Sequence, residues 1–217
     1  AEHRTAIEFA SKYDGQVVPV TALPQADITL LSVRPEQAEA ALSNVDWNGV
    51  TILSAMAGRS LADLQAAAPG AKIVRAMPIS AAALCASPTP LYPSNTLATA
   101  LLELVGAVIP FDDETIFEAA CANAAAYGWI FALIEQLENA NQKAGLSAPL
   151  ARQMTAETLR AAASVAAEHD GSMGALLNSL ATPGGITAHG LDVLEKANAL
   201  HPWAKAFDSV ADRLARK

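Results

Sequence analysis

The most specific chemical pattern in this chain is the segment Thr182-Pro183-Gly184-Gly185-Ile186-Thr187, which runs into a stretch with helical periodicity. A Thr-Pro-Gly-Gly turn ahead of a helix leaves backbone N–H groups unpaired at the positive end of the helix dipole. Such a place suits an anion, here a carboxylate, with the Thr187 hydroxyl close by. The alternative is an ordinary turn between two helices, in which Thr187 only caps the second one.

Three further segments of chemical interest each follow an expected strand: Ser32–Pro35, Ser54–Gly58 and Arg75–Pro78. In α/β proteins, ligands bind outside the carboxyl ends of the strands, although each segment alone could be a simple turn. The sequence contains neither a Gly-x-Gly-x-x-Gly pattern nor a P-loop, so the usual phosphate cradle is missing from these residues. No metal-binding spacing is present, and we interpret Cys85 and Cys121 as apolar fillers.

The elements that position these segments divide the chain into two halves. In the first half, apolar β-branched runs predict strands, separated by helices at about 36–42, 60–67 and 96–105; the strand ranges are 17–20, 27–33, 50–54, 72–76, 89–92 and 107–111. The run 27–33 is apolar on both faces, as expected for a buried parallel strand. The alternation of strands and helices predicts an α/β domain with a parallel sheet covered by helices on both sides.

The second half shows only helical periodicity. Helices are expected at about 114–126, 128–144, 148–168, 172–181, 187–199 and 203–216, with breaks that include Gly128 and His201-Pro202. The run Trp129–Ile134 is apolar all round, and a helix without a polar face must be buried on all sides. We therefore expect an all-α domain that forms at least a homodimer.

Composition excludes several classes of protein. Of the 217 residues, 52% are hydrophobic and 17% are charged, which rules out a disordered chain. The net charge of -8 argues against a nucleic-acid partner, and no uncharged apolar run reaches the ~18 residues of a membrane span. Two cysteines cannot form the framework of a secreted disulfide-rich domain, so a cytoplasmic location is expected.

Four segments together resemble the pyrroline-5-carboxylate reductase family. Leu180–Glu195 is similar to the signature Ser/Thr-Pro-Gly-Gly-x-Thr with a following helix that ends in Leu-Glu. Ser32–Glu36, Ser54–Gly58 and Val74–Pro78 resemble the family's Val-Lys-Pro-Gln, Ser-Ile-Ala-Ala-Gly and Val-Arg-Val-Met-Pro segments, in the same order and at similar spacing. The signature is fairly specific, whereas the other three segments count only in combination.

The resemblance implies a partial Rossmann-type domain at 1–112, which binds a dinucleotide, and an all-α domain for dimerisation and substrate binding at 113–217. Glu2-His3-Arg4-Thr5 looks like the stretch that follows the family's second strand, so by this resemblance the chain would begin just after that strand. By the same resemblance, Arg4 and Thr5 flank the adenosine ribose. An arginine there favours NADP over NAD, unless both residues are simply solvated at a frayed terminus.

The chemistry implied is hydride transfer from NADPH to the carbon of a C=N bond in a cyclic imine acid, as in proline biosynthesis. Thr187 would be the catalytic residue, donating a hydrogen bond to the imine nitrogen, and Thr182, Gly184 and Gly185 would bind the substrate carboxylate. The residues expected to contact the cofactor are Arg4, Thr5, Val33, Arg34, Pro35, Ala57 and Met77.

Two departures from the family pattern put this activity in question. Ile79-Ser80-Ala81 stands where the family has Asn-Thr-Pro, and Asn123–Gly128 lacks the serines of the family's Ser-Gly-Ser-Gly-Pro-Ala. The alternative is therefore a catalytically degenerate dimeric scaffold that binds a ligand or partner without turnover.

Overall fold

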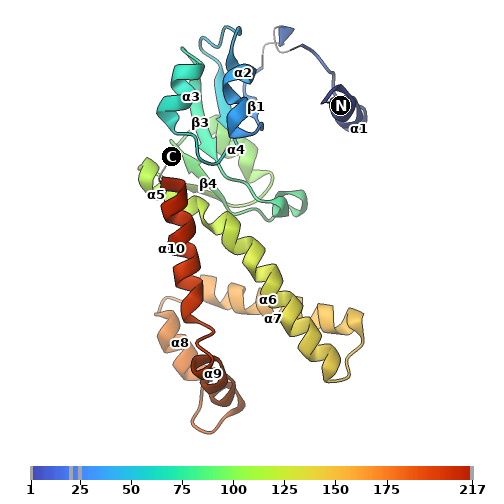
Figure 1. The fold of residues 1–217 in the computed structure, drawn as a ribbon, viewed down its shortest axis with the longest axis vertical. Helices are drawn as coiled ribbons and strands as arrows, with labels where there is room; N and C mark the ends of the chain where they lie inside the picture. Colours follow the sequence, from blue (N-terminus) through green and yellow to red (C-terminus); the bar gives the residue numbers. More distant parts are fainter. Residues whose placement is uncertain (1, 20–21, 24–25, 216–217) are drawn as a thin grey trace. The chain divides into compact units, whose positions relative to one another are not determined.

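The computed structural model describes residues 2–19, 22–23 and 26–215, which form two compact units. The first unit runs to Cys121 and also includes Leu214 and Ala215, and the second is Ala122–Arg213. In chain order, the elements of the first unit are α1 (Glu2–Lys12), β1 (Thr29–Leu31), the 3-10 helix η2 (Pro35–Gln37), α2 (Ala38–Leu42), β2 (Thr51–Ser54), α3 (Leu61–Ala67), β3 (Lys72–Ala76), the 3-10 helix η3 (Ser80–Leu84), β4 (Thr89–Tyr92), α4 (Thr96–Glu103), β5 (Val108–Pro110) and α5 (Glu114–Cys121) (Figure 1).

The sheet of the first unit has five strands in the order β1-β2-β3-β4-β5. β1, β2 and β3 are parallel, whereas β4 runs antiparallel to β3 and β5 runs parallel to β4. The sheet is thus mostly parallel rather than wholly so. The reason lies in the connection between β3 and β4, which contains only the short helix η3, whereas a parallel crossover needs a longer connection, usually an α-helix.

Alternate residues of the central strands face two separate cores, because side chains along a strand point to opposite faces. Ile52 and Ile73 are buried on one face with residues of α2 and α3. Leu53 and Val74 are buried on the other face with Ala98 and Leu102 of α4. Helices therefore cover both sides of the sheet, as the sequence pattern predicts.

Two expectations for the start of the sheet are wrong. The residues Val17–Pro19 are not in a strand, and Val20 lies outside the described residues. Among the described residues, β1 is an edge strand that pairs with β2 alone, so Leu30 is 59% exposed rather than buried on both faces.

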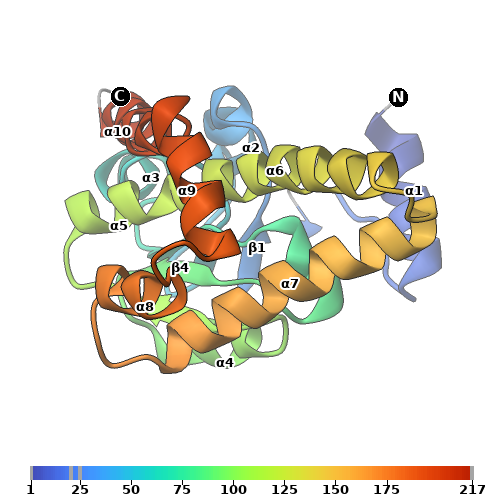
Figure 2. The ribbon, with the colours of Figure 1, turned by 90° about the horizontal axis from the view of Figure 1, so that it is seen from below.

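The second unit is helical. Its helices are α6 (Asn123–Lys143), α7 (Ala148–Glu168), α8 (Met173–Leu180), α9 (Ile186–Lys196) and α10 (His201–Ala215), of which α10 extends into the first unit by two residues. The long helices α6 and α7 contact each other (Figure 2).

Two expected helix breaks are displaced in the structure. Gly128 lies inside α6, and the break falls at Ala122 instead. His201 and Pro202 do not interrupt a helix but begin α10, because proline lacks only an N–H that is unpaired in a first helical turn anyway.

The helical stretch Glu114–Lys143 is long and apolar enough to cross a membrane by length and composition, and only 17% of its most apolar window is buried. The absence of an uncharged run of ~18 residues does not reveal this stretch, because Glu118 and Glu135 interrupt its apolar residues. Ile130 and Phe131 of α6 are 42% and 53% exposed. The stretch therefore presents apolar surface that the isolated chain does not cover.

Candidate functional site

The carboxyl ends of β1, β2 and β3 lie side by side at one edge of the sheet. In the parallel register, Leu31 pairs with Ser54, and Ser54 pairs with Arg75. The N–H of Ala55 donates a hydrogen bond to the carbonyl of Leu31 across 3.0 Å. The segments after these strands therefore emerge at the same edge. They carry five of the residues expected to contact a cofactor: Val33, Arg34, Pro35, Ala57 and Met77.

The side chains at this edge combine apolar surface with a cation. Arg34 is exposed and precedes the first turn of η2, where its N–H donates to the Gln37 side chain across 3.3 Å. Val33, Pro35, Ala57 and Met77 are half-buried. An exposed guanidinium beside apolar surface suits a phosphorylated ligand with a flat ring. That these residues contact a cofactor stays a prediction.

The turn after β3 is held by a pair of buried hydroxyls. The N–H of Met77 donates to the carbonyl of Pro90 across 3.1 Å, and the N–H of Ile79 donates to Ser87 Oγ across 3.0 Å. Ser87 Oγ is in turn 2.9 Å from Thr89 Oγ1, and both residues are fully buried. The side chain of Ile79 is apolar, and its backbone supplies the polar contact that fixes this turn.

Arg4 and Thr5 lie on α1, and both are exposed. Arg4 Nε is 3.0 Å from Glu8 Oε1, an ion pair within one helix. Among the interactions of the described residues, none joins Arg4 or Thr5 to the edge of the sheet. Their expected contact with the adenosine ribose therefore stays a prediction from the resemblance.

The glycine turn before α9 lies in the second unit. Gly184 has φ +74°, a conformation that favours glycine, and the N–H of Gly185 donates to the carbonyl of Thr182 across 2.9 Å. A Cβ on Gly185 would lie 2.6 Å from Thr182 Oγ1 and 3.0 Å from the Thr182 carbonyl oxygen. The turn therefore needs both glycines for its shape.

This geometry changes which groups could bind a carboxylate. The N–H of Gly185 is already used within the turn, and Gly185 is the N-cap of α9. The unpaired donors of the first helical turn are those of Ile186, Thr187 and Ala188, since the first bond inside the helix runs from His189 to Gly185. Thr187 is exposed in the first turn and its side chain does not cap the helix.

An ion-pair network at the end of β3 escaped the sequence analysis. Arg75 is 1% exposed; its Nη1 lies 2.6 Å from Glu114 Oε1 and its Nη2 lies 2.5 Å from Glu118 Oε1. The N–H of Leu61 also donates to Glu114 Oε1 across 2.6 Å. The sequence does contain a signal for this network, namely an arginine inside the apolar run of β3, because a buried arginine requires a charged or polar partner.

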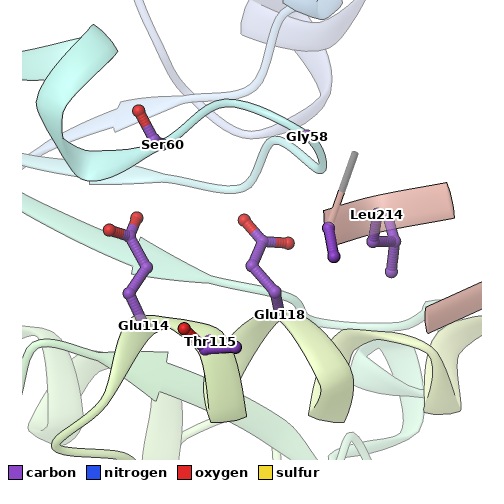
Figure 3. A pocket seen from close by; sticks show the side chains of 7 residues that line it. Gly58, Ser60, Glu114, Thr115, Glu118 and Leu214 are labelled. Atoms are coloured by element: carbon purple, nitrogen blue, oxygen red, sulfur yellow. The ribbon is translucent and has the colours of Figure 1, made fainter. Parts of the chain in front are cut away.

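The two glutamates of this network face a pocket of about 190 Å³ in the first unit. In Figure 3, the carboxylates of Glu114 and Glu118 point toward the loop that carries Gly58 and Ser60. Thr115, Leu214 and Ala215 complete the lining. Two carboxylates therefore line this pocket beside one buried guanidinium.

Cys121 lies at the end of α5, and its thiol is buried. Burial raises its pKa from 9.0 to about 12; the negative charge of Glu118 adds to the rise and Arg75 opposes it. The thiol is therefore neutral near pH 7, as the interpretation of an apolar filler requires. Among the described residues, no group of three or more His, Cys, Asp or Glu side chains is placed to hold a metal ion.

Comparison with known proteins gives one consistent result. Residues 114–217 match the family model for pyrroline-5-carboxylate reductase dimerisation. The pyrroline-5-carboxylate reductase of Haemophilus influenzae is 30% identical over 184 residues, which cover 79% of this chain and 68% of the relative.

Two solved structures share the fold. The 1-pyrroline-5-carboxylate reductase of Streptococcus pyogenes has a TM-score of 0.84 at 24% identity, with 97% of this chain and 85% of the other covered. The pyrroline carboxylate reductase of Plasmodium falciparum with NADP bound has a TM-score of 0.83 at 21% identity, with 92% and 80% covered.

The class is thus an α/β protein with a mostly parallel five-stranded sheet domain followed by a helical dimerisation domain. Within that class, the chain belongs to the pyrroline-5-carboxylate reductase family.

Proposed function

We propose that this protein is an NADP-dependent reductase that acts on a cyclic imine acid, with pyrroline-5-carboxylate as the first substrate to test. The observation that carries the proposal is the Thr-Pro-Gly-Gly-Ile-Thr turn, which opens α9 with unpaired N–H donors and an exposed hydroxyl. Membership in a family of such reductases supports it.

The residues at the edge of the sheet fit part of a dinucleotide. Arg34 offers a guanidinium, and the half-buried Val33, Ala57 and Met77 offer apolar surface. These 217 residues contain no Gly-x-Gly-x-x-Gly turn, the pattern that usually binds the pyrophosphate. When bound, NADPH supplies the hydride, and the protein contributes binding, orientation and a proton.

The turn before α9 can bind an imine acid at two points. The N–H groups of Ile186 and Ala188 face the positive end of the helix, where a carboxylate is stabilised. The Thr187 hydroxyl on the same turn can donate a hydrogen bond to the imine nitrogen, which becomes more basic as the hydride reaches the neighbouring carbon. This pairing of carboxylate and nitrogen selects a ring in which the two groups are close.

We further propose a homodimer as the minimum assembly. The apolar surface of Glu114–Lys143 is uncovered in the single chain, and the family model that matches this region describes dimerisation. Both observations favour a second copy of the chain as the partner that covers this apolar surface.

A second candidate function is ligand binding without turnover. It is favoured by the alanines that follow Asn123 at the start of α6, where the family has serine hydroxyls. Under this alternative, the turn before α9 still binds an anionic ligand, but no hydride is transferred.

The experiment follows NADPH consumption and proline formation from pyrroline-5-carboxylate, at millimolar NADPH to compensate for weak binding. Turnover by the parent that is lost in Thr187→Val supports the reductase. Binding of pyrroline-5-carboxylate or proline in calorimetry without NADPH consumption supports the second candidate. If the protein shows neither turnover nor binding, both candidate functions are contradicted.

A further inference from the structure

Arg75 is a buried cation inside an apolar strand, two residues before Met77. Its neighbours Val74 and Ala76 are also buried, and its own side chain is 1% exposed. A guanidinium removed from water to this degree requires charged partners, because the cost of an unpaired buried charge is prohibitive.

The partners come from successive turns of α5. Glu114 and Glu118 are four residues apart, so they lie on one face of the helix. Each accepts a hydrogen bond from one of the two terminal nitrogens of Arg75. The ring of Phe117, between them in the sequence, lies 4.8 Å from the guanidinium carbon. A single helix, α5, therefore supplies two charged partners and an aromatic contact to this cation.

Glu114 has a second role that Glu118 lacks. The oxygen that accepts the Arg75 nitrogen also accepts the N–H of Leu61, the first residue of α3. Ser60 and Asp63 cap one another at this helix start, and their bonds leave the Leu61 N–H to be satisfied from elsewhere. A single carboxylate oxygen thus joins the end of β3 to the loop that carries Ala57 and Gly58.

Resting on the cofactor site of the proposed function, we propose that Glu114 is a positioning residue. It fixes the loop Ala57–Ser60 against the carboxyl end of β3, and so sets the spacing of the two segments that would contact the cofactor. Glu114 does not touch the cofactor itself, since its carboxylate faces Arg75 and α3.

The two glutamates form a matched pair of variants because each removal leaves the same charge. With one arginine and two glutamates, Glu114→Ala and Glu118→Ala each leave a neutral one-to-one pair around Arg75. Only Glu114→Ala also removes the acceptor of the Leu61 N–H. Glu118→Ala is therefore the control for lost charge and lost side-chain volume.

The first measurement is hydrogen exchange of the backbone N–H groups in the full chain, which needs no cofactor. In Glu114→Ala, we expect exchange over 57–61 to rise roughly 10- to 100-fold, the effect of losing a charge-assisted hydrogen bond. In Glu118→Ala, the same residues should stay within about threefold of the parent. An equal rise in both variants, or no rise in Glu114→Ala, would overturn the proposal.

The second measurement separates positioning from mere stability. We expect the KM for NADPH to rise roughly 10-fold in Glu114→Ala, with a smaller change in kcat, since the misplaced segments bind the cofactor rather than the imine. An unchanged KM despite faster exchange would contradict a positioning role. If a parent with its complete cofactor domain shows no turnover, the proposed function fails, and the exchange data alone then decide whether Glu114 holds the loop.

Discussion

At the scale of single residues, Thr187 can be tested for catalysis with little interference from stability. Gly185, not Thr187, is the N-cap of α9, so Thr187→Val removes a hydroxyl that does not cap the helix. We expect the free energy of unfolding to change by less than about 0.5 kcal/mol. Loss of a hydrogen bond to the imine nitrogen should cost roughly 2–4 kcal/mol in the transition state, a fall in kcat/KM of roughly 30- to 1,000-fold.

The measurements are steady-state kinetics at saturating NADPH and thermal unfolding, both made on a form of the protein that has its complete cofactor domain. NADPH affinity should stay within a factor of about two, because the hydroxyl is assigned to the substrate. A Thr187→Val variant that turns over like the parent would remove Thr187 from the mechanism.

The two cysteines should differ sharply in reactivity. Cys85 is exposed, whereas Cys121 is buried with its pKa raised to about 12, so its thiolate is scarce at pH 8. We expect a thiol reagent at pH 8 to label one site per native chain, with labelling lost in Cys85→Ser and kept in Cys121→Ala. Two fast-reacting thiols in the native protein would contradict the buried environment.

The same shift makes stability fall in alkali. The unfolded thiol of Cys121 loses its proton near pH 9, whereas the folded thiol keeps it until about pH 12. The unfolded state therefore binds fewer protons across this window, and the contribution of Cys121 to stability declines as the pH rises.

Sequence reasoning found the candidate residues whose chemistry is local and missed those whose chemistry is tertiary. The turn before α9 could be predicted because glycines and a proline specify it within six residues. The hydrogen bond from Arg75 to Glu114 joins residues 39 positions apart, and the bond from the Leu61 N–H to Glu114 joins residues 53 positions apart. No local pattern encodes such a pair; only the unexplained arginine in an apolar strand pointed to it.

At the scale of elements, Gly106 should be the glycine least tolerant of substitution among those in the sheet domain. Its φ is +143°, and a Cβ there would lie 2.2 Å from the carbonyl oxygen of Ser87 and 2.4 Å from its nitrogen. We expect Gly106→Ala to destabilise the protein by roughly 2–5 kcal/mol, since backbone rather than a mobile side chain must move. Denaturant unfolding provides the measurement.

Gly174 offers the matched control, because it lies in α8 and its Cβ would meet only Ser172 Oγ at 4.0 Å. Gly174→Ala should be neutral or stabilise by up to about 1 kcal/mol. Equal effects of the two substitutions would show that the close approach to Ser87 is relaxed in solution.

The elements that sequence reasoning misplaced share a cause. The direction of β4 depends on whether the connection after β3 returns the chain to the start of the sheet, and strand propensity carries no information about this connection. Gly128 and Pro202 were interpreted as helix breakers, but a glycine can be carried within a 21-residue helix, and a proline fits the first turn of α10. In each case the neighbouring structure outweighed a local preference.

At the scale of the whole molecule, the chain should sediment as a dimer at micromolar concentration. The interface is expected to bury more than about 2,000 Å² in total, as obligate interfaces do. Phe131→Asp, which places a charge on the exposed apolar surface of α6, should shift the species toward the monomer. Leu104→Asp is the control, because Leu104 is 70% exposed but lies in the first unit. A parent that sediments as a monomer would contradict the dimer.

The 217-residue chain should bind NADPH weakly or not at all. Without a glycine-rich turn, the pyrophosphate loses both the close approach of the backbone and a helix N-terminus. Isothermal titration calorimetry should give a Kd well above the micromolar range. Micromolar affinity for this same chain would mean that the phosphates bind at another place on the sheet edge.

The buried network around Arg75 also constrains how the sequence can diverge. Losing the arginine first leaves two partly buried carboxylates close together without a cation, whereas losing one glutamate first leaves a neutral pair. The order of substitutions therefore matters. In related sequences that have lost this network, a glutamate should have been replaced before the arginine. Sequences with Arg75 replaced and both glutamates kept should be rare. Evolution at these three positions is expected to be strongly epistatic.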